Sequence, residues 1–403
     1  MDAAGLAEAF ATPPRSAGAW AFWFLNDDLD EAELSRQLEA FADAGFGGVC
    51  PCARVGLSAD VGYLTERWWQ LLRHVVAECA RLGLEVILYD EASYPSGSAN
   101  GAVAAADPEH ASRCLASAER VVDLAPGEVA YARPNLGRGL WDRRVATVLT
   151  PASGPSRLVE PDAAGLVRLD AAALGPGRHR VHAFFDAPSG GTIRGAHAHQ
   201  DDGSALAPAS ADLLNPDAVA SFLRLTHDAY AAHVGDWFGS TVVAMFTDEP
   251  QITGRNPRAA SVAWTPGFEH DLARAAGVEV AETLAALPEV FVPGSRWAAA
   301  HARAVSERLA RVYYGAQRAW CDRHGLALTG HPHDADELRA LDAFTWPGQD
   351  TVWRWVLPGE TALLGPQSAA ARCVGSAAAL RRLVGGVEGA GRPGVALTEV
   401  SLG

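Results

Sequence analysis

The chain has 403 residues, enough for one large α/β barrel with an insertion or for two to three ordinary domains. Apolar residues make up 49% of the chain and charged residues 20%, so we expect a sizeable core and no global disorder. The formal net charge of −15 disfavours nucleic acid or an anionic membrane as a partner, because neutralising phosphates requires a basic face.

The first ninety residues alternate between strand and helix patterns. Short β-prone runs predict strands at 20–25, 47–50 and 84–89. Between them, helices are predicted at 31–45 and 65–83, each starting at a capping residue and stopping at a glycine. This order predicts parallel strands joined by right-handed crossovers.

The pattern changes after the third strand. Residues 114–210 are rich in Gly, Pro and short β-prone runs, which predict a small antiparallel β insertion. The expected domain organisation is a first part of a catalytic barrel at 1–113, the β-rich insertion at 114–210 and the remainder of the barrel at 211–403.

Strand and helix patterns then resume. A helix is predicted from Asn215, a capping residue, to about residue 235, and a strand at 241–247. The connection at 250–293, which contains Trp264, is long enough to be a candidate substrate loop. The remaining predicted elements are helices at 295–323 and 368–384 and strands at 326–329, 344–346 and 395–398.

Together these elements predict the α/β class and a (β/α)₈ TIM-type barrel. Seven strands are predicted, and the chain ends four residues after Glu399. We therefore expect a barrel truncated after its seventh strand, with the eighth strand absent, and an antiparallel β insertion after the third.

Three of the predicted strands end on carboxylates. Asp90 and Glu91 follow the third strand, Asp248 and Glu249 the fourth, and Glu399 the last. The carboxyl ends of barrel strands form the floor of the active site, so these acids are expected to converge. Converging acids suit proton transfer, of which sugar hydrolysis is the leading example. Solvated strand ends or structural salt bridges remain the alternative for each.

Other candidate residues lie near the same strand ends and would contact a sugar. Carboxylates would accept hydrogen bonds from its hydroxyl groups, while aromatic rings would pack on its C–H surfaces. Core packing explains the tryptophan equally well, and the two histidines could instead bind a metal or cap the next helix. The predicted substrate-binding residues are Trp23, Asn26, Asp27, Arg54, Asp90, Glu91, Tyr94, Asp248, His331, His333 and Asp350.

Several common catalytic motifs are absent from the sequence. It has no G-x-S-x-G nucleophile elbow, no H-E-x-x-H zinc helix and no G-x-G-x-x-G dinucleotide loop. All 33 basic residues are arginines, which excludes a Walker-type phosphate loop, a pyridoxal Schiff base and a lysine general base.

The cysteines and the N-terminal region indicate the cellular compartment. The six cysteines lie mostly in apolar surroundings without a CxxC pair, so we expect reduced core residues. The first twenty residues lack the features of a signal peptide, and no stretch approaches the ~18 apolar residues that a membrane helix needs. A cytoplasmic location without a membrane partner is therefore expected.

Seven motifs support a more specific hypothesis through their order. They are Trp23-Phe24-Leu25-Asn26-Asp27, Gly45-Phe46-Gly47-Gly48-Val49, Leu88-Tyr89-Asp90-Glu91, Tyr94-Pro95-Ser96-Gly97-Ser98, Leu214-Asn215-Pro216, Phe246-Thr247-Asp248-Glu249-Pro250 and Leu397-Thr398-Glu399. Together they resemble glycoside hydrolase family 106, the α-L-rhamnosidase type, and its bacterial relatives. The resemblance spans most of residues 18–403, except the β insertion.

The resemblance implies a barrel enzyme that cleaves a terminal sugar, with α-L-rhamnose as the first candidate, from an oligosaccharide or glycoside. It implies inversion by two glutamates: Glu249 would be the general acid, and Glu399 would be the base that activates water. It also suggests calcium near the sugar, without identifying its ligands, and no other cofactor.

Two alternative functions stay open. The chain could be a non-catalytic carbohydrate-binding relative or an inactive fragment of a longer enzyme. It could also be a retaining glycosidase of other specificity, such as a β-galactosidase-like enzyme. Retaining barrel glycosidases usually carry Asn before the fourth-strand Glu, where this chain has Asp248. The sequence therefore favours the inverting mechanism over the retaining one.

Overall fold

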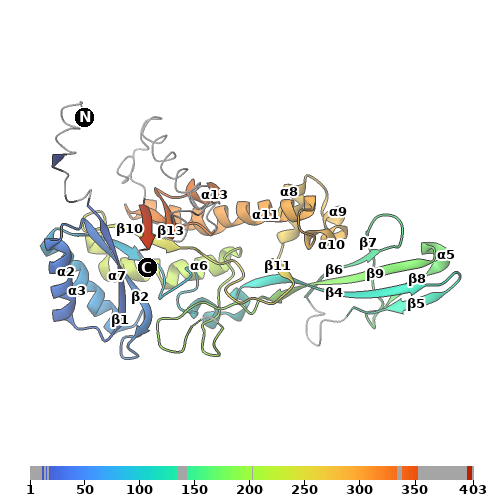
Figure 1. Cartoon of the computed structure of the whole chain (residues 1–403), viewed down its shortest axis with the longest axis horizontal. Coiled ribbons are helices and arrows are strands. Elements are labelled where there is room, and N and C mark those ends of the chain that lie inside the picture. The colour runs from blue at the N-terminus through green and yellow to red at the C-terminus, as the bar shows by residue number, and fades with distance from the viewer. Residues whose placement is uncertain are drawn as a thin grey trace, which may run out of the picture. The chain divides into compact units, whose positions relative to one another are not determined.

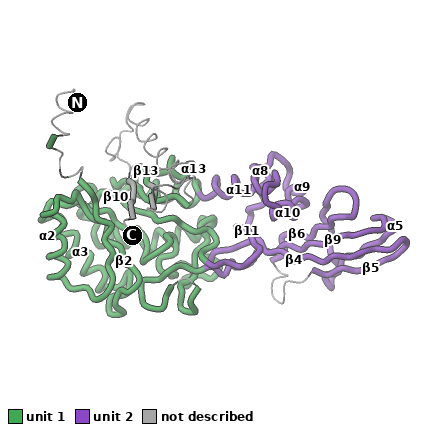
Figure 2. Tube along the Cα trace, viewed as in Figure 1, with its two compact units in different colours: residues 1–110, 192–255, 310–403 green, residues 111–191, 256–309 purple. Residues whose placement is uncertain are grey.

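The computed structural model describes residues 11–12, 15, 18–134, 143–201, 203–333, 338–352 and 397–401. The chain divides into two compact units (Figures 1 and 2). Unit 1 comprises residues 1–110, 192–255 and 310–403, and unit 2 comprises residues 111–191 and 256–309. The chain therefore leaves unit 1 twice to build unit 2, whereas the sequence division placed one excursion at 114–210.

A seven-stranded parallel sheet is the centre of unit 1. Its strands, in hydrogen-bonding order, are β1 (Trp20–Asp27), β2 (Gly48–Leu57), β3 (Glu85–Tyr89), β10 (Val242–Asp248), β12 (Ala327–His331), β13 (Trp346–Val352) and β14 (Leu397–Ser401). The predicted parallel sheet is confirmed. Pairing of β14 with β1, which would close a barrel, does not occur among the described residues. What the structure shows is a parallel sheet whose strands follow one another in chain order.

The first two helices of unit 1 begin and end close to signals found in the sequence. The Asp30 side chain accepts two backbone N–H groups at the start of α2 (Glu31–Asp43), and Thr65 caps α3 (Glu66–Leu82). Gly83, at φ +69°, ends α3 in the left-handed conformation that glycine adopts without strain. The other described helices of unit 1 are α4 (Ala102–Ala106), α6 (Pro216–Leu225), α7 (His227–Val234), α12 (Gly315–Arg323) and α13 (Leu338–Leu341).

Two helices predicted as continuous are interrupted. Thr226 divides the helix predicted at 215–235 into α6 and α7. The helix predicted at 295–323 becomes α11 (Arg296–Leu309), a π-helical turn at Ala310–Tyr314 and then α12. The helix predicted at 368–384 lies outside the described residues.

Strands β2, β3, β10 and β12 of unit 1 are buried on both faces along most of their length, as expected for a parallel sheet. Side chains of one face form a cluster, and the alternating residues of the same strands, such as Val49, Val86 and Met245, are equally buried. The cluster comprises Cys50, Cys52, Ile87, Tyr89, Ala244, Phe246, Ala327 and Trp346. All five cysteines in the described part of the chain are buried, as predicted.

Unit 2 contains the antiparallel β structure that the sequence predicts. Its larger sheet has the order β11 (Ser261–Ala263), β4 (Arg113–Leu124), β9 (Gly177–Pro188), β6 (Arg144–Thr150) and β7 (Arg157–Leu158). A second sheet pairs β5 (Val129–Ala132) with β8 (Val167–Asp170). Apolar side chains from both sheets, among them Leu149, Val181 and Leu169, form the core of this unit.

The segment predicted as a substrate loop is largely helical. Residues 256–309 belong to unit 2 and contain β11, α8 (Phe268–Ala276), α9 (Val280–Ala285), α10 (Leu287–Val290) and α11. Trp264 is buried and packs edge-on against Phe268, so Trp264 belongs to the core of unit 2. The loop prediction is wrong because the segment pairs and packs within its own unit.

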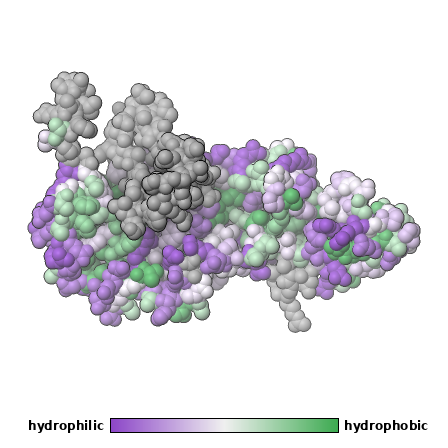
Figure 3. Space-filling model, viewed as in Figure 1, coloured by the Kyte–Doolittle hydropathy of each residue, from purple (hydrophilic) through white to green (hydrophobic). Residues whose placement is uncertain are grey.

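The visible surface is mixed in character. Hydrophilic and hydrophobic residues are interspersed over the described parts of both units (Figure 3). None of the described helices is long and apolar enough to cross a membrane.

Candidate active site

The end of β10 brings two acids to a sharp turn. Asp248 is the last residue of β10 and is 4% exposed. Glu249 follows with φ +36°, a conformation that residues other than glycine seldom adopt, and Pro250 comes next. Backbone conformations of this kind gather at functional sites, where the surrounding structure supports them. The turn leaves Glu249 partly exposed beside the buried Asp248.

A cavity of about 480 Å³ lies at this turn. Its lining comes from β1, β2, the loop after β3, β10 and β13, so the carboxyl ends of several parallel strands do converge. Its volume is in the range of sites for small molecules. The lining residues are Phe22, Phe24, Asn26, Arg54, Val55, Ser93, Tyr94, Arg194, Asp248, Glu249 and Asp350.

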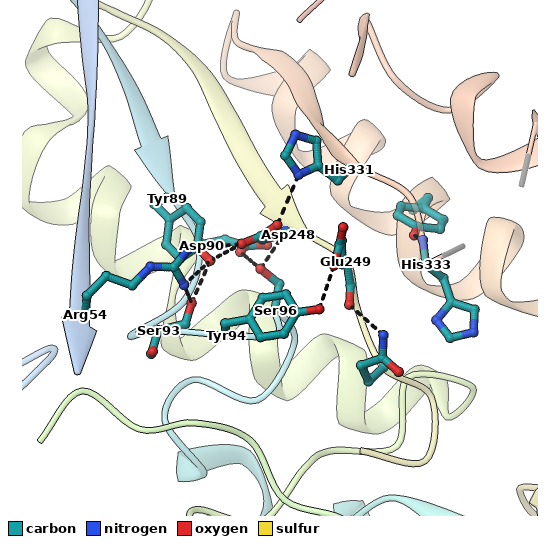
Figure 4. A network of polar contacts seen from close by, with 12 residues as sticks. Arg54, Tyr89, Asp90, Ser93, Tyr94, Ser96, Asp248, Glu249, His331 and His333 are labelled. Carbon is teal, nitrogen blue, oxygen red and sulfur yellow. Dashed lines mark hydrogen bonds and ion pairs between the residues drawn. The ribbon is translucent and has the colours of Figure 1, made fainter. Parts of the chain in front are cut away.

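Asp248 is the centre of a polar network at the cavity (Figure 4). The Tyr89 hydroxyl lies 2.7 Å from its carboxylate, Nδ1 of His331 lies at 3.2 Å and the Arg54 guanidinium at 3.5 Å. Ser96 Oγ accepts the Asp248 backbone N–H at 2.7 Å. Burial opposes the charge, but His331, Arg54 and Tyr89 outweigh it and lower the pKa of Asp248. Asp248 is therefore an ionised carboxylate at neutral pH.

Glu249 has the opposite electrostatic environment. Burial and the adjacent charge of Asp248 raise the pKa of Glu249, although a hydrogen bond from Tyr94 favours its ionised form. The Tyr94 hydroxyl donates to Glu249 Oε2 at 2.5 Å (Figure 4). Burial and the charge of Glu249 also raise the pKa of Tyr94, which keeps its phenol protonated. Neighbouring carboxyl groups with pKa values pushed apart are typical of acid–base catalysis.

Arg54 links the polar network to an aromatic surface. Its guanidinium lies 4.6 Å from the ring centre of Phe24 and 5.4 Å from those of Phe22 and Tyr89. Phe24 is 47% exposed, so an open ring borders the cavity. Cation–π contacts of this kind hold a guanidinium in place. Arg54 lies within β2, which extends beyond the predicted strand, rather than after it.

Sequence reasoning missed Phe22 and Phe24, although a usable signal was present. Side chains alternate between the two faces of a strand, so Phe22, Phe24 and Asn26 share one face of β1 and Trp23 belongs to the other. Trp23 is 6% exposed, and its indole N–H donates to Gln37 Oε1 at 2.8 Å. The structure thus places the predicted Trp23 outside the cavity lining.

The two acids after β3 lie in the protein interior. Asp90 is fully buried and accepts a hydrogen bond from Ser96 at 2.5 Å, while burial raises its pKa. Glu91 accepts four backbone N–H groups of the following loop. Ser96 thus bridges Asp90 to the backbone of Asp248, and Glu91 supports the loop that carries Tyr94.

The remaining predicted residues lie at different distances from the cavity. His331 is buried behind Asp248, and His333 hydrogen-bonds through Nδ1 to the Pro250 carbonyl at 2.7 Å. Neither histidine is among the lining residues. Asp27 is exposed at the end of β1, where its side chain accepts the Asp28 backbone N–H.

Asp350 and Glu399 are neighbours in the sheet. Asp350 lies on β13 and lines the cavity, and its charge contributes to the raised pKa of Glu249. Glu399 lies on β14 in register with Asp350. The backbone of Glu399 is therefore next to a cavity residue, while its side chain lies outside the described residues.

The described residues include no group of three or more His, Cys, Asp or Glu side chains arranged to hold a metal ion. The calcium suggested by the family resemblance stays a prediction.

The chain matches no protein-family model and no curated protein. It does share its fold with the solved rhamnosidase of Novosphingobium sp. PP1Y, with a TM-score of 0.62, 16% identity and coverage of 93% of this chain and 52% of that one. The chain thus spans about half the length of that rhamnosidase.

Two other glycoside hydrolases show weaker likeness. A β-galactosidase from Halorubrum lacusprofundi has a TM-score of 0.40 and 11% identity over 83% of this chain and 40% of that one. A chitobiase from Flavobacterium johnsoniae has a TM-score of 0.30 and 8% identity over 83% and 34%. The comparisons establish a fold similar to the rhamnosidase, and the family predicted from the motifs remains a prediction.

Proposed function

We propose that the chain is a glycoside hydrolase that removes a terminal sugar from an oligosaccharide or glycoside. The observation that carries the proposal is the pair of adjacent acids at the cavity, an ionised Asp248 and a Glu249 whose pKa is raised by burial and by that charge. The fold shared with a rhamnosidase makes α-L-rhamnose the first sugar to test.

Glu249 acts as the general acid in this proposal. Its protonated carboxyl donates a proton to the glycosidic oxygen as the bond to the sugar breaks. The Tyr94 hydroxyl orients the carboxyl and stabilises the charge left on it. The fixed negative charge of Asp248 stabilises the positive charge that develops on the sugar ring in the transition state.

The base in this proposal is Glu399. Its backbone pairs in register with that of Asp350, a residue that lines the cavity, and this pairing supports the role. An inverting enzyme needs about 6.5–9.5 Å between its two carboxyl groups to admit a water, and a retaining enzyme about 5–5.5 Å. NMR of the first-formed product anomer distinguishes inversion from retention.

Substrate recognition is assigned to residues that line the cavity. Asn26, Arg54 and Asp350 supply hydrogen-bonding groups, and the exposed ring of Phe24 suits the C–H face of a sugar. His331 lies outside the cavity lining and hydrogen-bonds to Asp248, which makes it a positioning residue.

The test is release of reducing sugar from a rhamnosyl disaccharide by the full chain and by Glu249→Gln. We expect release by the parent chain and a loss of at least about a hundredfold in the variant, the scale of general acid catalysis. Glu39→Gln, at an exposed ion pair with Arg81, is the matched control. Calorimetric binding of the disaccharide without release would support the non-catalytic carbohydrate-binding alternative instead.

A further inference from the structure

Unit 2 contains a second cavity of about 480 Å³, lined entirely by its own residues. One wall is a face of the five-stranded sheet, formed by β4, β9 and β6. The other wall is formed by residues of α10 and just beyond it, namely Pro288, Glu289, Phe291 and Val292. The activity proposed for unit 1 does not use this cavity.

The two faces of this sheet differ sharply in chemistry. Leu149 and Val181 point to the face that packs on β5 and β8, where they form an apolar core. The opposite face presents Glu119, paired in register with His182, and Thr150, paired with Arg180. The side chains of Glu119 and Arg180 are partly exposed, at 38% and 51%, whereas Val148 and Phe184 are buried on the same face. Accessible polar groups beside buried apolar ones, at an open volume, are typical of a ligand site.

The charged groups leave hydrogen-bonding capacity for a ligand. Glu119 Oε2 lies 3.8 Å from both Arg180 and His182, which is too long for a direct hydrogen bond. Burial lowers the pKa of His182, so its ring is neutral near pH 7 and can both donate and accept. Thr150 and Ser156 add a pair of hydroxyl groups 2.8 Å apart.

The apolar part of the cavity has a fixed ring. Phe291 stacks on the buried Phe184, with ring centres 5.8 Å apart and an angle of 28° between the rings. The neighbouring Val292 is exposed and lines the same cavity. A ring edge and an aliphatic side chain opposite a row of polar groups suit a ligand with one apolar and one hydroxyl-rich side.

We propose that this cavity is a second carbohydrate site, which binds a neutral saccharide through Glu119, His182 and Arg180 and packs it against Phe291. The mixture of charges selects this ligand class. Glu119 and Glu289 would repel an anion, whereas the hydroxyl groups of a neutral sugar donate to these carboxylates and accept from the Arg180 guanidinium.

The test is NMR of the full chain with ¹³C-labelled histidine, because His182 reports on this cavity alone. Its ring signal is assigned by comparison with His182→Asn. The probes are the methyl glycosides of α-L-rhamnose, β-D-galactose and β-D-glucose. We expect at least one probe to shift the His182 signal saturably, with a Kd at or below about 10 mM, the weak end of measurable binding.

Two matched variants each neutralise one carboxylate of unit 2. Glu119→Gln should weaken the binding of that probe about tenfold, as expected for loss of a hydrogen bond to a charged group. Glu160→Gln, whose side chain is 89% exposed in an ion pair with Arg144, should leave the affinity unchanged.

A His182 signal that no probe moves overturns the proposal, and so does equal affinity in the two variants. A response to sulfate with none to the sugars also overturns it, in favour of an anion site. The readout is independent of hydrolysis. A chain that releases no sugar, but whose His182 signal responds, loses the function proposed for unit 1 and keeps the second site.

Discussion

Replacing Glu91 with Gln should strongly destabilise unit 1. The Glu91 carboxylate accepts the backbone N–H groups of Ala92 and Asn100 at Oε1 and those of Ser98 and Ala99 at Oε2, at 2.5–2.8 Å. The residue is 1% exposed. One buried side chain therefore satisfies four main-chain donors of the loop that follows β3.

The size of the effect follows from this hydrogen-bond count. Gln retains one acceptor oxygen and turns an NH₂ group toward the other two donors, which then lose their acceptor in a buried site. Each such loss costs about 1–3 kcal/mol, so unfolding should become easier by about 2–6 kcal/mol. That is a large fraction of the ~5–15 kcal/mol by which domains are stable.

Urea unfolding followed by tryptophan fluorescence measures the change. Glu39→Gln is the control, because an exposed ion pair contributes little to stability. Glu91→Gln should also disturb the contact between Tyr94 and Glu249, since Tyr94 lies in the same loop. Equal unfolding midpoints for Glu91→Gln and Glu39→Gln would refute the assigned role of Glu91.

Three further predictions concern pKa values. Tyr94→Phe removes a hydrogen-bond donor that favours the ionised form of Glu249, so the pKa of Glu249 should rise. Because a general acid works below its pKa, the alkaline limb of the kcat–pH profile should move to higher pH. Movement of this limb to lower pH would contradict the prediction. Arg54→Gln removes a cation that lowers the pKa of Asp248. The stability that a lowered carboxyl pKa provides is lost as the pH falls through that pKa, so acid unfolding of the variant should begin at a higher pH than in the parent chain. An unchanged onset of acid unfolding would count against the ion pair. Burial raises the pKa of Cys79 to about 12, so iodoacetamide at pH 8 should leave this thiol unmodified in the folded chain. Rapid labelling of Cys79, detected by mass spectrometry, would contradict its burial.

The sequence predicted best what depends on local signals. Thr65 and Gly83 predicted the two ends of α3 to within one residue, because helix capping depends on a few groups that are adjacent in the sequence. The end of β10 at Asp248 and Glu249 could also be predicted, since a buried parallel strand is a continuous apolar run that ends at a polar turn.

What the sequence did not reveal depends on distant parts of the chain. Residues 250–293 were predicted as a long connection because the unit 2 partners of β11 lie more than a hundred residues earlier. The role of Glu91 rests on four backbone N–H groups whose directions are set by the folded loop. Strand alternation places Trp23 on the face of β1 opposite Phe22 and Phe24, but which of the two faces borders the cavity is known only from the structure.

The central claim is that Glu249 protonates the departing glycosidic oxygen. The most direct test compares kcat/KM of the parent chain and Glu249→Gln on aryl α-L-rhamnosides whose phenol leaving groups span a wide range of pKa values. Good leaving groups need no proton, so the variant should be close to the parent on the most acidic phenols and fall progressively behind as leaving-group pKa rises. A loss of the same size on every substrate, or no loss on the poorest leaving group, would contradict this role for Glu249.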